Sequence, residues 1–284
     1  GLKELGTKAD RQDDLLVQDF AALQTADTKH VTEIPTAEKE VKYEYLQKWI
    51  KQTLDFIASL DAEKFSGGIA YLLLSLAYRI DYLISPEGTM LYDIEKIAGI
   101  YFRKDERPAI EKNRDMIGEL KKMQAKTKEE VFKNLIRTRY TFSIVAPQTH
   151  KAIADAIQAA NQNVAWYRDN NYPVIATQII EYGIAYCQYS FSLPRAITEF
   201  FQLFMAINYA EYFEALGFKE KLYNPASQKF AQGLIIERIK QIQDKWRSKY
   251  PNMNFVFENL RFSNLIDFNL AYTMEIERLN MESK

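Results

Sequence analysis

Large apolar side chains recur every three or four positions along most of the chain, and this spacing predicts α-helices that pack on one another. Residues 69–84 are apolar nearly all round, which is typical of a helix covered by others on every side. The helix expected after Pro35 has a single apolar face. The members of that face are Val41, Tyr45, Trp49, Ile50, Leu54 and Ile57.

Capping residues and prolines predict where several of these helices begin and end. Thr127 is followed three residues later by a glutamate, which is the pattern of a capping box. Pro173 and Pro194 each suit the first position of a long apolar helix. We expect the helix after Pro194 to run as far as Gly217, with Phe218 making the hydrophobic contact of a Schellman cap.

Further helices are expected over residues 90–101, 110–120, 152–164 and 265–279, and four other segments are predicted as follows. An opening helix is expected over residues 10–26, and the helix that Thr127 opens is expected to pass through Ile136. Residues 226–249 have the spacing of a helix, whereas residues 254–262 alternate in part and are compatible with one short strand. The sequence therefore predicts an all-α protein, a multi-helix bundle or layered helical array of about ten helices.

No low-complexity linker separates these elements, so we expect a single all-helical domain over residues 1–284, with at most a weak subdivision near residue 146. Residues 77–101 resemble residues 185–209 in the spacing of alanine, tyrosine and proline. A duplicated helical hairpin would produce this similarity. Chance is the simpler explanation, because alanine and tyrosine are frequent in the chain and true helical repeats show tighter periods.

The composition supports the helical prediction and narrows the function classes. The chain has only 10 Gly and 8 Pro in 284 residues, which suits long packed helices better than a many-turned β-sandwich. Its formal net charge of -1 argues against a protein whose main task is to grip nucleic acid. A local basic surplus between Arg103 and Arg139 leaves nucleic-acid binding as a lesser hypothesis, although interleaved charges usually mark a solvated helix face.

The cysteine count and the hydropathy pattern limit the cellular compartments in which we expect the protein. Cys187 is the single cysteine, so no disulfide can form within the chain, and its apolar surroundings predict a buried, inert thiol. No run of 18 apolar residues is present, so we expect no membrane span. These features are compatible with a cytoplasmic protein and with a processed extracytoplasmic one.

The sequence contains no established metal or catalytic motif. The two histidines, His30 and His150, belong to neither a Glu-x-x-His pair nor a His-Glu-x-x-His motif, so we predict no protein-bound zinc or di-iron centre. The acidic residues between Asp13 and Asp19 suit the first turn of a helix, whose dipole they complement. Since phosphate-binding and nucleophile-elbow motifs are also missing, we expect no cofactor, and an enzyme is the less favoured interpretation.

Aromatic residues concentrate between Trp166 and Phe218, where 14 of the 38 in the chain fall within 53 residues. Bulky rings buried in a large core would explain this excess. A rim of tyrosines around a pocket or a partner surface is the alternative, and residues at helical spacing could form one face of it. The candidate residues of that surface are Tyr182, Tyr186, Tyr189, Arg195, Tyr209, Glu181 and Glu211, the two glutamates as candidate buried acids.

Two functional hypotheses follow from these observations. The first is a non-enzymatic binding or structural protein that presents its aromatic helical surface to a protein partner or to a second copy of itself. The second is an enzyme or carrier that holds a hydrophobic or aromatic small molecule in an apolar pocket between its central helices. The identity of the ligand or partner is not encoded in any local motif.

Overall fold

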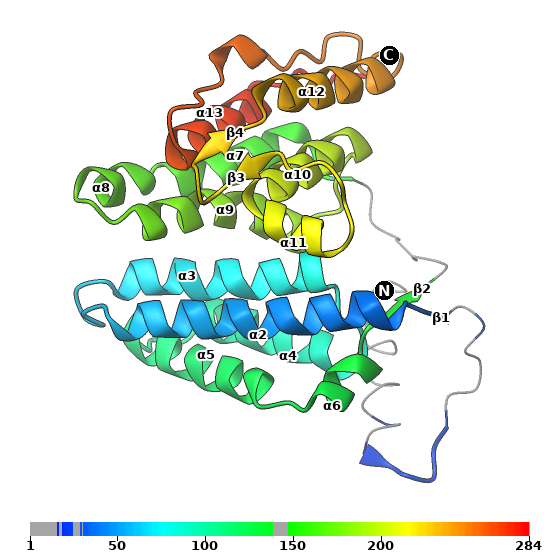
Figure 1. The fold of residues 1–284 in the computed structure, drawn as a ribbon. Coiled ribbons are helices and arrows are strands. Elements are labelled where there is room, and N and C mark those ends of the chain that lie inside the picture. Colours follow the sequence, from blue (N-terminus) through cyan, green and yellow to red (C-terminus); the bar gives the residue numbers. More distant parts are fainter. Residues whose placement is uncertain (1–15, 17–18, 25–28, 30, 139–146, 284) are drawn as a thin grey trace. The chain divides into compact units, whose positions relative to one another are not determined.

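The computed structural model describes residues 16, 19–24, 29, 31–138 and 147–283 (Figure 1). Most of the predicted opening helix, most of the acidic run 13–19 and His30 lie outside these residues. The described chain is overwhelmingly helical with two short two-stranded sheets, so the predicted all-α class is confirmed. It divides into two compact units, residues 1–146 and 147–284. Whether both units act as a single domain stays a prediction.

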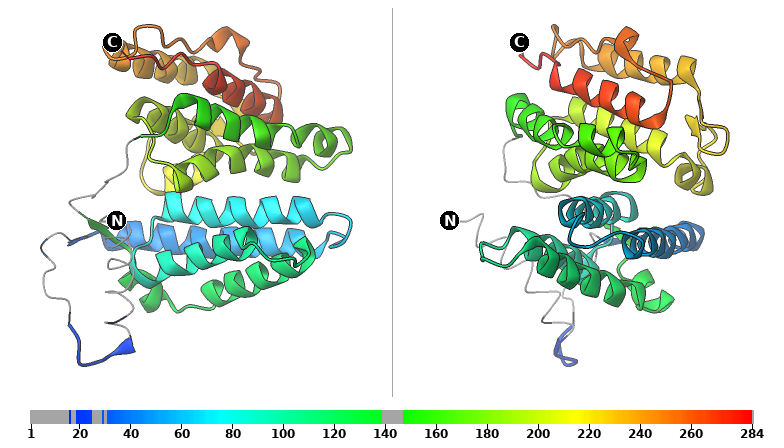
Figure 2. Two further views of the ribbon diagram at one scale, coloured as in Figure 1. Left: turned by 180° about the vertical axis from the view of Figure 1, so that it is seen from behind. Right: turned by 90° about the vertical axis from the view of Figure 1, so that its left-hand side faces the viewer.

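The first unit consists of long helices that run side by side (Figures 1 and 2). Helices α2 and α3 pack on each other, and both contact α5, which also lies against α4. The predicted helix after Pro35 is confirmed as α2, with Leu46, Trp49 and Ile50 buried. The elements are β1 Val31–Glu33, α2 Thr36–Ala58, α3 Ser66–Arg79, π-helix η1 Ile80–Ile84, α4 Gly88–Phe102, α5 Ala109–Gln124, α6 Lys128–Lys133 and β2 Ile136–Thr138.

The apolar segment 69–84 forms α3 and the π-helix η1, and α3 is buried along almost its whole length. The wider turn of η1 closes where Ser85 N–H donates to the carbonyl of Ile80 over 3.0 Å, and Ser85 adopts a left-handed conformation with φ 51°. Among the described residues, Ser66–Ile84 is the one helix long and apolar enough to cross a membrane, and 78% of the tested window is buried. A helix buried to this extent is no clear membrane span.

The capping box predicted at Thr127 is confirmed, but the helix that it opens is shorter than expected. Thr127 Oγ1 accepts from Glu130 N–H over 3.2 Å, and Glu130 Oε2 accepts from Thr127 N–H over 2.6 Å. The prediction that the helix passes through Ile136 is wrong. Asn134 ends it, because its side-chain amide bonds back to the carbonyl of Glu130 and its Oδ1 accepts from Met90 N–H at the start of α4.

Ile136 belongs instead to β2, which pairs with β1 in an antiparallel ladder. Val31 lies opposite Thr138 in this ladder, although more than a hundred residues separate them in the sequence. Next to the ladder, Arg137 forms a salt bridge of 2.8 Å with Glu38 of α2. The short sheet therefore joins the segment that precedes α2 to the segment that follows α6.

The second unit packs its helices around α9 (Figure 2). Helices α7, α8 and α13 contact α9, while α10 contacts α12 and α13. A Cβ atom at Gly183 of α9 would lie 3.2 Å from Cβ of Ala160 on α7, so these two helices approach each other closely. The elements are α7 His150–Asn161, α8 Val164–Asp169, α9 Pro173–Ser190, α10 Arg195–Asn208, α11 Ala210–Ala215, β3 Tyr223–Asn224, β4 Lys229–Phe230, α12 Gln232–Trp246, 3-10 helix η2 Phe257–Asn259 and α13 Leu265–Glu277.

The Schellman cap predicted at Gly217 is confirmed. Phe218 N–H donates to the carbonyl of Phe213, Gly217 has φ 94°, and the two phenylalanine rings meet edge to face at 5.4 Å. The helix that leads to this cap is not continuous, however, because α10 ends at Asn208 and α11 begins after Tyr209. The Asn208 side chain donates to the carbonyl of Phe204, which competes with the backbone ladder at that point.

Two other boundaries differ from the prediction. The helix expected from residue 226 begins only at Gln232, because Asn224 Oδ1 accepts from the N–H groups of Ala226 and Ser227 and turns the chain into the β3–β4 hairpin. Residues 254–262 form no strand, and the short strands lie elsewhere. The buried carboxylate of Glu275 accepts from Val256 N–H and from the Asn259 amide, which fixes this segment as a loop with one 3-10 turn.

A continuous series of aromatic rings fills the core of the second unit. Tyr272 lies at its centre, with ring centroids 5.0 Å from Phe255, 5.9 Å from Phe204 and 5.7 Å from Phe268. Its hydroxyl donates to the carbonyl of Phe200, so the buried phenol has a hydrogen-bond partner. Burial also raises the pKa of Tyr272 well above its usual range. The aromatic residues of α10 are therefore core residues.

Candidate functional site

The structure joins two of the seven predicted site residues by a hydrogen bond. The hydroxyl of Tyr209 donates to Oε2 of Glu181, and Nε2 of Gln178 donates to the same oxygen over 2.8 Å. Glu181 is only 2% exposed. A buried carboxylate of this kind needs donors to offset its lost hydration, and the tyrosine and glutamine supply them.

The other predicted residues are distributed differently. Tyr182 and Tyr186 of α9 stack on each other with ring centroids 5.8 Å apart, and both are half-buried, as is Tyr189. Arg195 and Glu211 are exposed, so the expectation that Glu211 is a buried acid is wrong. The residue lies in the first turn of α11, where its neighbours Ala210 and Tyr212 are the buried positions.

A groove of about 560 Å³ lies in the second unit, beside the Glu181 network. Three stretches distant in the sequence line it: the end of α8 with the N-terminal turns of α9, the β3–β4 hairpin, and the N-terminal turn of α13. We call it the α9–α13 groove. Gln178 connects it to the buried network, because it lines the groove and bonds to Glu181.

The wall of the α9–α13 groove carries side-chain amides in several orientations. Asn171, Gln178, Gln228 and Asn264 all line it. Two of them have left-handed backbones, with φ 64° at Asn171 and φ 53° at Gln228. Such conformations are costly for residues other than glycine, so the surrounding structure must hold them in place.

Two opposite charges complete the wall. Hydrogen bonding of Arg168 to Asp169 over 2.9 Å raises the pKa of the guanidinium, with a further contribution from the charge of Asp267. Asp267 Oδ2 in turn accepts from Ser263 and Asn264. The groove therefore combines a fixed cation, a fixed carboxylate and several amides, which suits a polar ligand that both donates and accepts hydrogen bonds.

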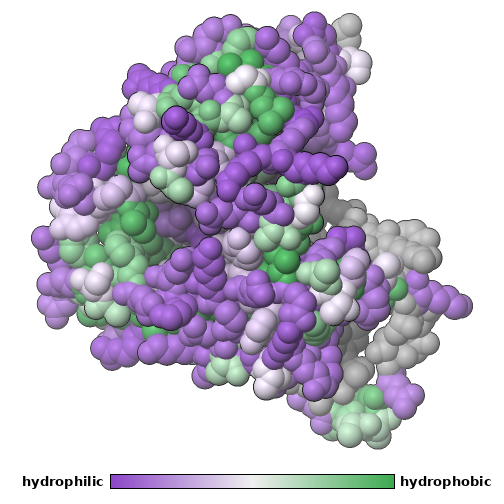
Figure 3. All heavy atoms as spheres, in the orientation of Figure 1, coloured by the Kyte–Doolittle hydropathy of each residue, from purple (hydrophilic) through white to green (hydrophobic). Residues whose placement is uncertain are grey.

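Exposed apolar side chains belong to the same stretch of chain as the groove wall. Trp166 and Tyr172 stack with their ring planes at 7° and their centroids 6.0 Å apart, and Trp166 remains 50% exposed. Val174, which lines the groove, is 46% exposed. Figure 3 shows such hydrophobic groups set among hydrophilic ones on the surface of the second unit. A half-exposed tryptophan close in the sequence to groove-lining residues is compatible with a recognition surface.

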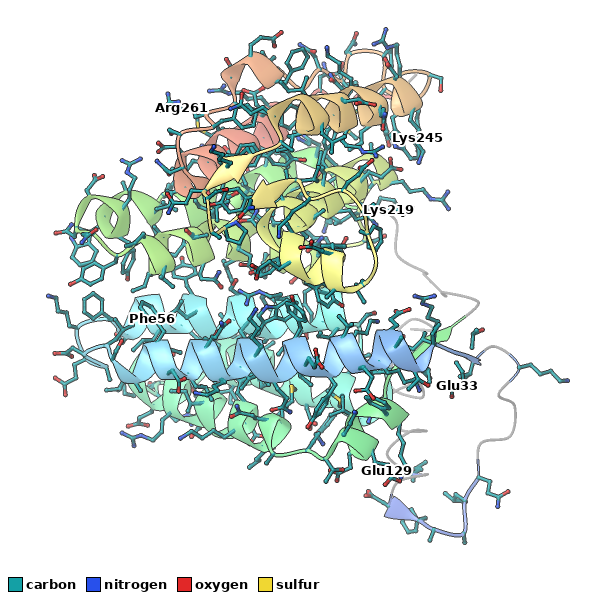
Figure 4. All side chains as sticks on the ribbon, viewed as in Figure 1. Glu33, Phe56, Glu129, Lys219, Lys245 and Arg261 are labelled. Atoms are coloured by element: carbon teal, nitrogen blue, oxygen red, sulfur yellow. The ribbon has the colours of Figure 1, made fainter. Side chains whose placement is uncertain are left out.

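The basic stretch between Arg103 and Arg139 has a different character. Many of its described cations form ion pairs with carboxylates, for example Lys112 with Asp105 over 3.0 Å and Lys126 with Asp93 over 3.1 Å. Many charged side chains project outward, as Glu129 and Lys245 do in Figure 4. This pairing favours a solvated helix surface over a nucleic-acid interface.

Two further kinds of candidate group, a reactive thiol and a metal-binding cluster, find no support in the described residues. Cys187 is buried as predicted, and burial raises the pKa of its thiol to about 12, which keeps the thiol protonated. Within the described part of the chain, no three His, Cys, Asp or Glu side chains lie close enough to hold a metal ion.

Sequence reasoning missed the α9–α13 groove, because its wall comes from three separate stretches of the chain. The one local signal was the run Asn170-Asn171-Tyr172-Pro173, which reads as a break between helices and supplies a left-handed asparagine to the wall.

Comparison of the chain with protein-family models, with curated proteins and with solved structures gave no match. The function is therefore argued from the site itself.

Proposed function

We propose that the protein is a non-enzymatic binding protein that holds an extended segment of a protein partner in the α9–α13 groove. The observation that carries this proposal is the half-exposed Trp166, stacked on Tyr172, which lies in the chain between the groove-lining residues Asn171 and Pro173. Tryptophan, tyrosine and arginine dominate the binding energy of protein interfaces, and all three belong to this short stretch of chain.

The chemistry of the wall favours a peptide as the occupant. An asparagine or glutamine amide has both a donor and an acceptor, as the peptide backbone does, so it can pair with an extended chain in either direction. The bond from Gln178 to the buried Glu181 fixes the orientation of one of these amides. A groove of about 560 Å³ lies within the usual range for bound ligands.

The alternative, an apolar small molecule held between central helices, has less support. Phe204 of α10 is fully buried and packs against Tyr272, so the aromatic rings themselves fill the space around it. An apolar ligand would also find few matching groups in the amide-rich groove.

The proposal predicts that peptides selected for binding depend on Trp166. Peptides would be selected from a random library displayed on phage against the full chain, and their affinities measured by calorimetry. We expect Trp166→Ala and Arg168→Ala each to weaken binding about tenfold or more, because truncated hot-spot residues commonly cost 1.4 kcal/mol or more.

Phe102→Ala is the matched control, since Phe102 is, like Trp166, 50% exposed and packed against a tyrosine ring, but belongs to the first unit. It should leave peptide affinity unchanged. Failure to select any binding peptide, or peptides that bind Trp166→Ala as tightly as the unmodified chain, would contradict the proposal. Circular dichroism of each variant checks that the helices are intact.

A further inference from the structure

A second groove, of about 670 Å³, lies in the second unit at the N-terminal end of α7. Residues that follow α12 and α13, together with Pro194 just before α10, form the rest of its wall. We call it the α7 groove. It shares no lining residue with the α9–α13 groove, so it is a separate feature of the unit.

Three basic side chains line the α7 groove: His150, Lys249 and Arg278. Glu282 is the acidic residue among its lining residues. The first turn of α7, a helix of twelve residues, also faces this groove through Thr149 and His150, and the positive end of a helix dipole favours a negative charge. The lining therefore carries a basic surplus, whereas the charges lining the α9–α13 groove are balanced.

His150 is held in place by a backbone carbonyl. Its Nε2 lies 2.7 Å from the carbonyl oxygen of Ile276, near the end of α13. Because a carbonyl only accepts, Nε2 must carry the proton in this contact. The bond secures the imidazole beside the segment that carries Arg278, two residues further along the chain.

Arg278 and Lys249 have donors left for a ligand. Arg278 uses Nη1 to bond to Glu275 over 3.1 Å, but a guanidinium has five N–H groups, and this side chain is 58% exposed. Lys249 lies with Nζ 5.2 Å from the centre of the Tyr250 ring and forms no ion pair with any residue that the structure describes. A cation that is not neutralised by a carboxylate is available for an external anion.

We propose that the α7 groove binds a phosphate group. Arginine presents a planar fork of donors to phosphate oxygens, lysine contributes a compact charge, and a helix N-terminus adds to the positive potential. The proposal is independent of the peptide-binding function, because it concerns other residues.

Inorganic phosphate is the probe. The full chain, labelled with ¹⁵N in its histidines, would be titrated with potassium phosphate at constant pH and ionic strength. We expect the ring resonances of His150, assigned by comparison with His150→Gln, to shift and to saturate at millimolar phosphate. Lys249→Gln should weaken this binding about fivefold, because it removes one of the charges that contact the anion.

Lys151→Gln is the matched control, since Lys151 lies on the same helix, pairs with Asp155 and does not line the groove. It should leave the saturation curve unchanged. Arg278→Gln is the second variant, and it should weaken phosphate binding even if the loss of the bond to Glu275 lowers stability. A linear shift without saturation, or equal weakening by Lys151→Gln, would overturn the proposal.

A parallel titration with phosphatidylcholine vesicles that contain phosphatidic acid distinguishes the source of the phosphate group. Saturation by the inorganic ion assigns the groove to soluble phosphates. Saturation by the vesicles alone, again reduced by Lys249→Gln, assigns it to a lipid headgroup. Both results would support phosphate recognition, and a response to neither would refute it.

Discussion

Replacing Phe268 with alanine is expected to lower the free energy of unfolding of the second unit by about 3–5 kcal/mol, the usual cost of truncating a buried phenylalanine. Phe268 is completely buried on α13, and its ring centroid lies 4.8 Å from Phe230, 5.4 Å from Phe262 and 5.7 Å from Tyr272. The truncation removes contacts to three rings at once, and these rings come from separate segments that cannot easily collapse into the space.

Urea denaturation of the full chain, followed by near-ultraviolet circular dichroism of the aromatic core, measures this loss. Met274→Ala is the matched control on the same helix, because Met274 is 42% exposed and alanine preserves the helix. It should change the free energy of unfolding by less than about 1 kcal/mol. Equal effects of the two substitutions would show that the series of rings is not the centre of the core.

Replacing Asp81 with asparagine is expected to stabilise the first unit at pH 7 by about 2–3 kcal/mol. Asp81 lies on the π-helix η1, where burial raises the pKa of its carboxyl to about 6, with smaller contributions from the charges of Glu87 and Glu95. At neutral pH the carboxylate of Asp81 is ionised, although its burial disfavours the charged form. Asparagine removes the charge at nearly the same size.

The raised pKa of Asp81 also predicts the direction in which the stability of the fold changes with pH. The pKa of Asp81 is higher in the folded chain than its ordinary value near 4, so folding favours the protonated form. The corresponding stability is fully present below about pH 4 and is lost as the pH rises through about 6. The difference between Asp81→Asn and the unmodified chain should therefore be large at pH 7 and small at pH 4.

Urea denaturation at both pH values, with hydrogen exchange of peptides from α3 and α4, tests this prediction. Asp55→Asn is the control in the same unit, because Asp55 is 65% exposed in its salt bridge with Lys51. Its effect should stay within about 0.5 kcal/mol. An Asp81→Asn variant that is less stable at pH 7 than the unmodified chain would contradict the assignment.

The helical architecture could be predicted from the sequence because its signals are local. Spacing of apolar residues located α2 and the buried helix over residues 69–84, and short-range chemistry located the caps at Thr127 and Gly217. The wrong predictions, of the helix end after Asn134 and of a strand over residues 254–262, share a different cause. At Asn134 and Glu275, polar side chains bond to distant segments, and these bonds overrule the local pattern.

The candidate site was predicted only in part for the same reason. The pair Glu181 and Tyr209 lay among the predicted residues, but nothing in their spacing indicates that a hydroxyl of one segment reaches the carboxylate of another. The α9–α13 groove depends on Arg168, Gln228 and Asp267, which meet only after the chain has folded. The spacing of residues shows which side chains share one face of a helix. To predict a groove, one would also have to know how several helices are placed relative to one another.

The β1–β2 ladder has a consequence for how the first unit could be rebuilt. Since Val31 lies directly opposite Thr138, the chain enters and leaves this group of helices at a single point. A short linker could join these two residues, and new termini could be opened in the exposed turn between α2 and α3, as in circular permutation. The helices would then keep their neighbours while their order along the chain changed.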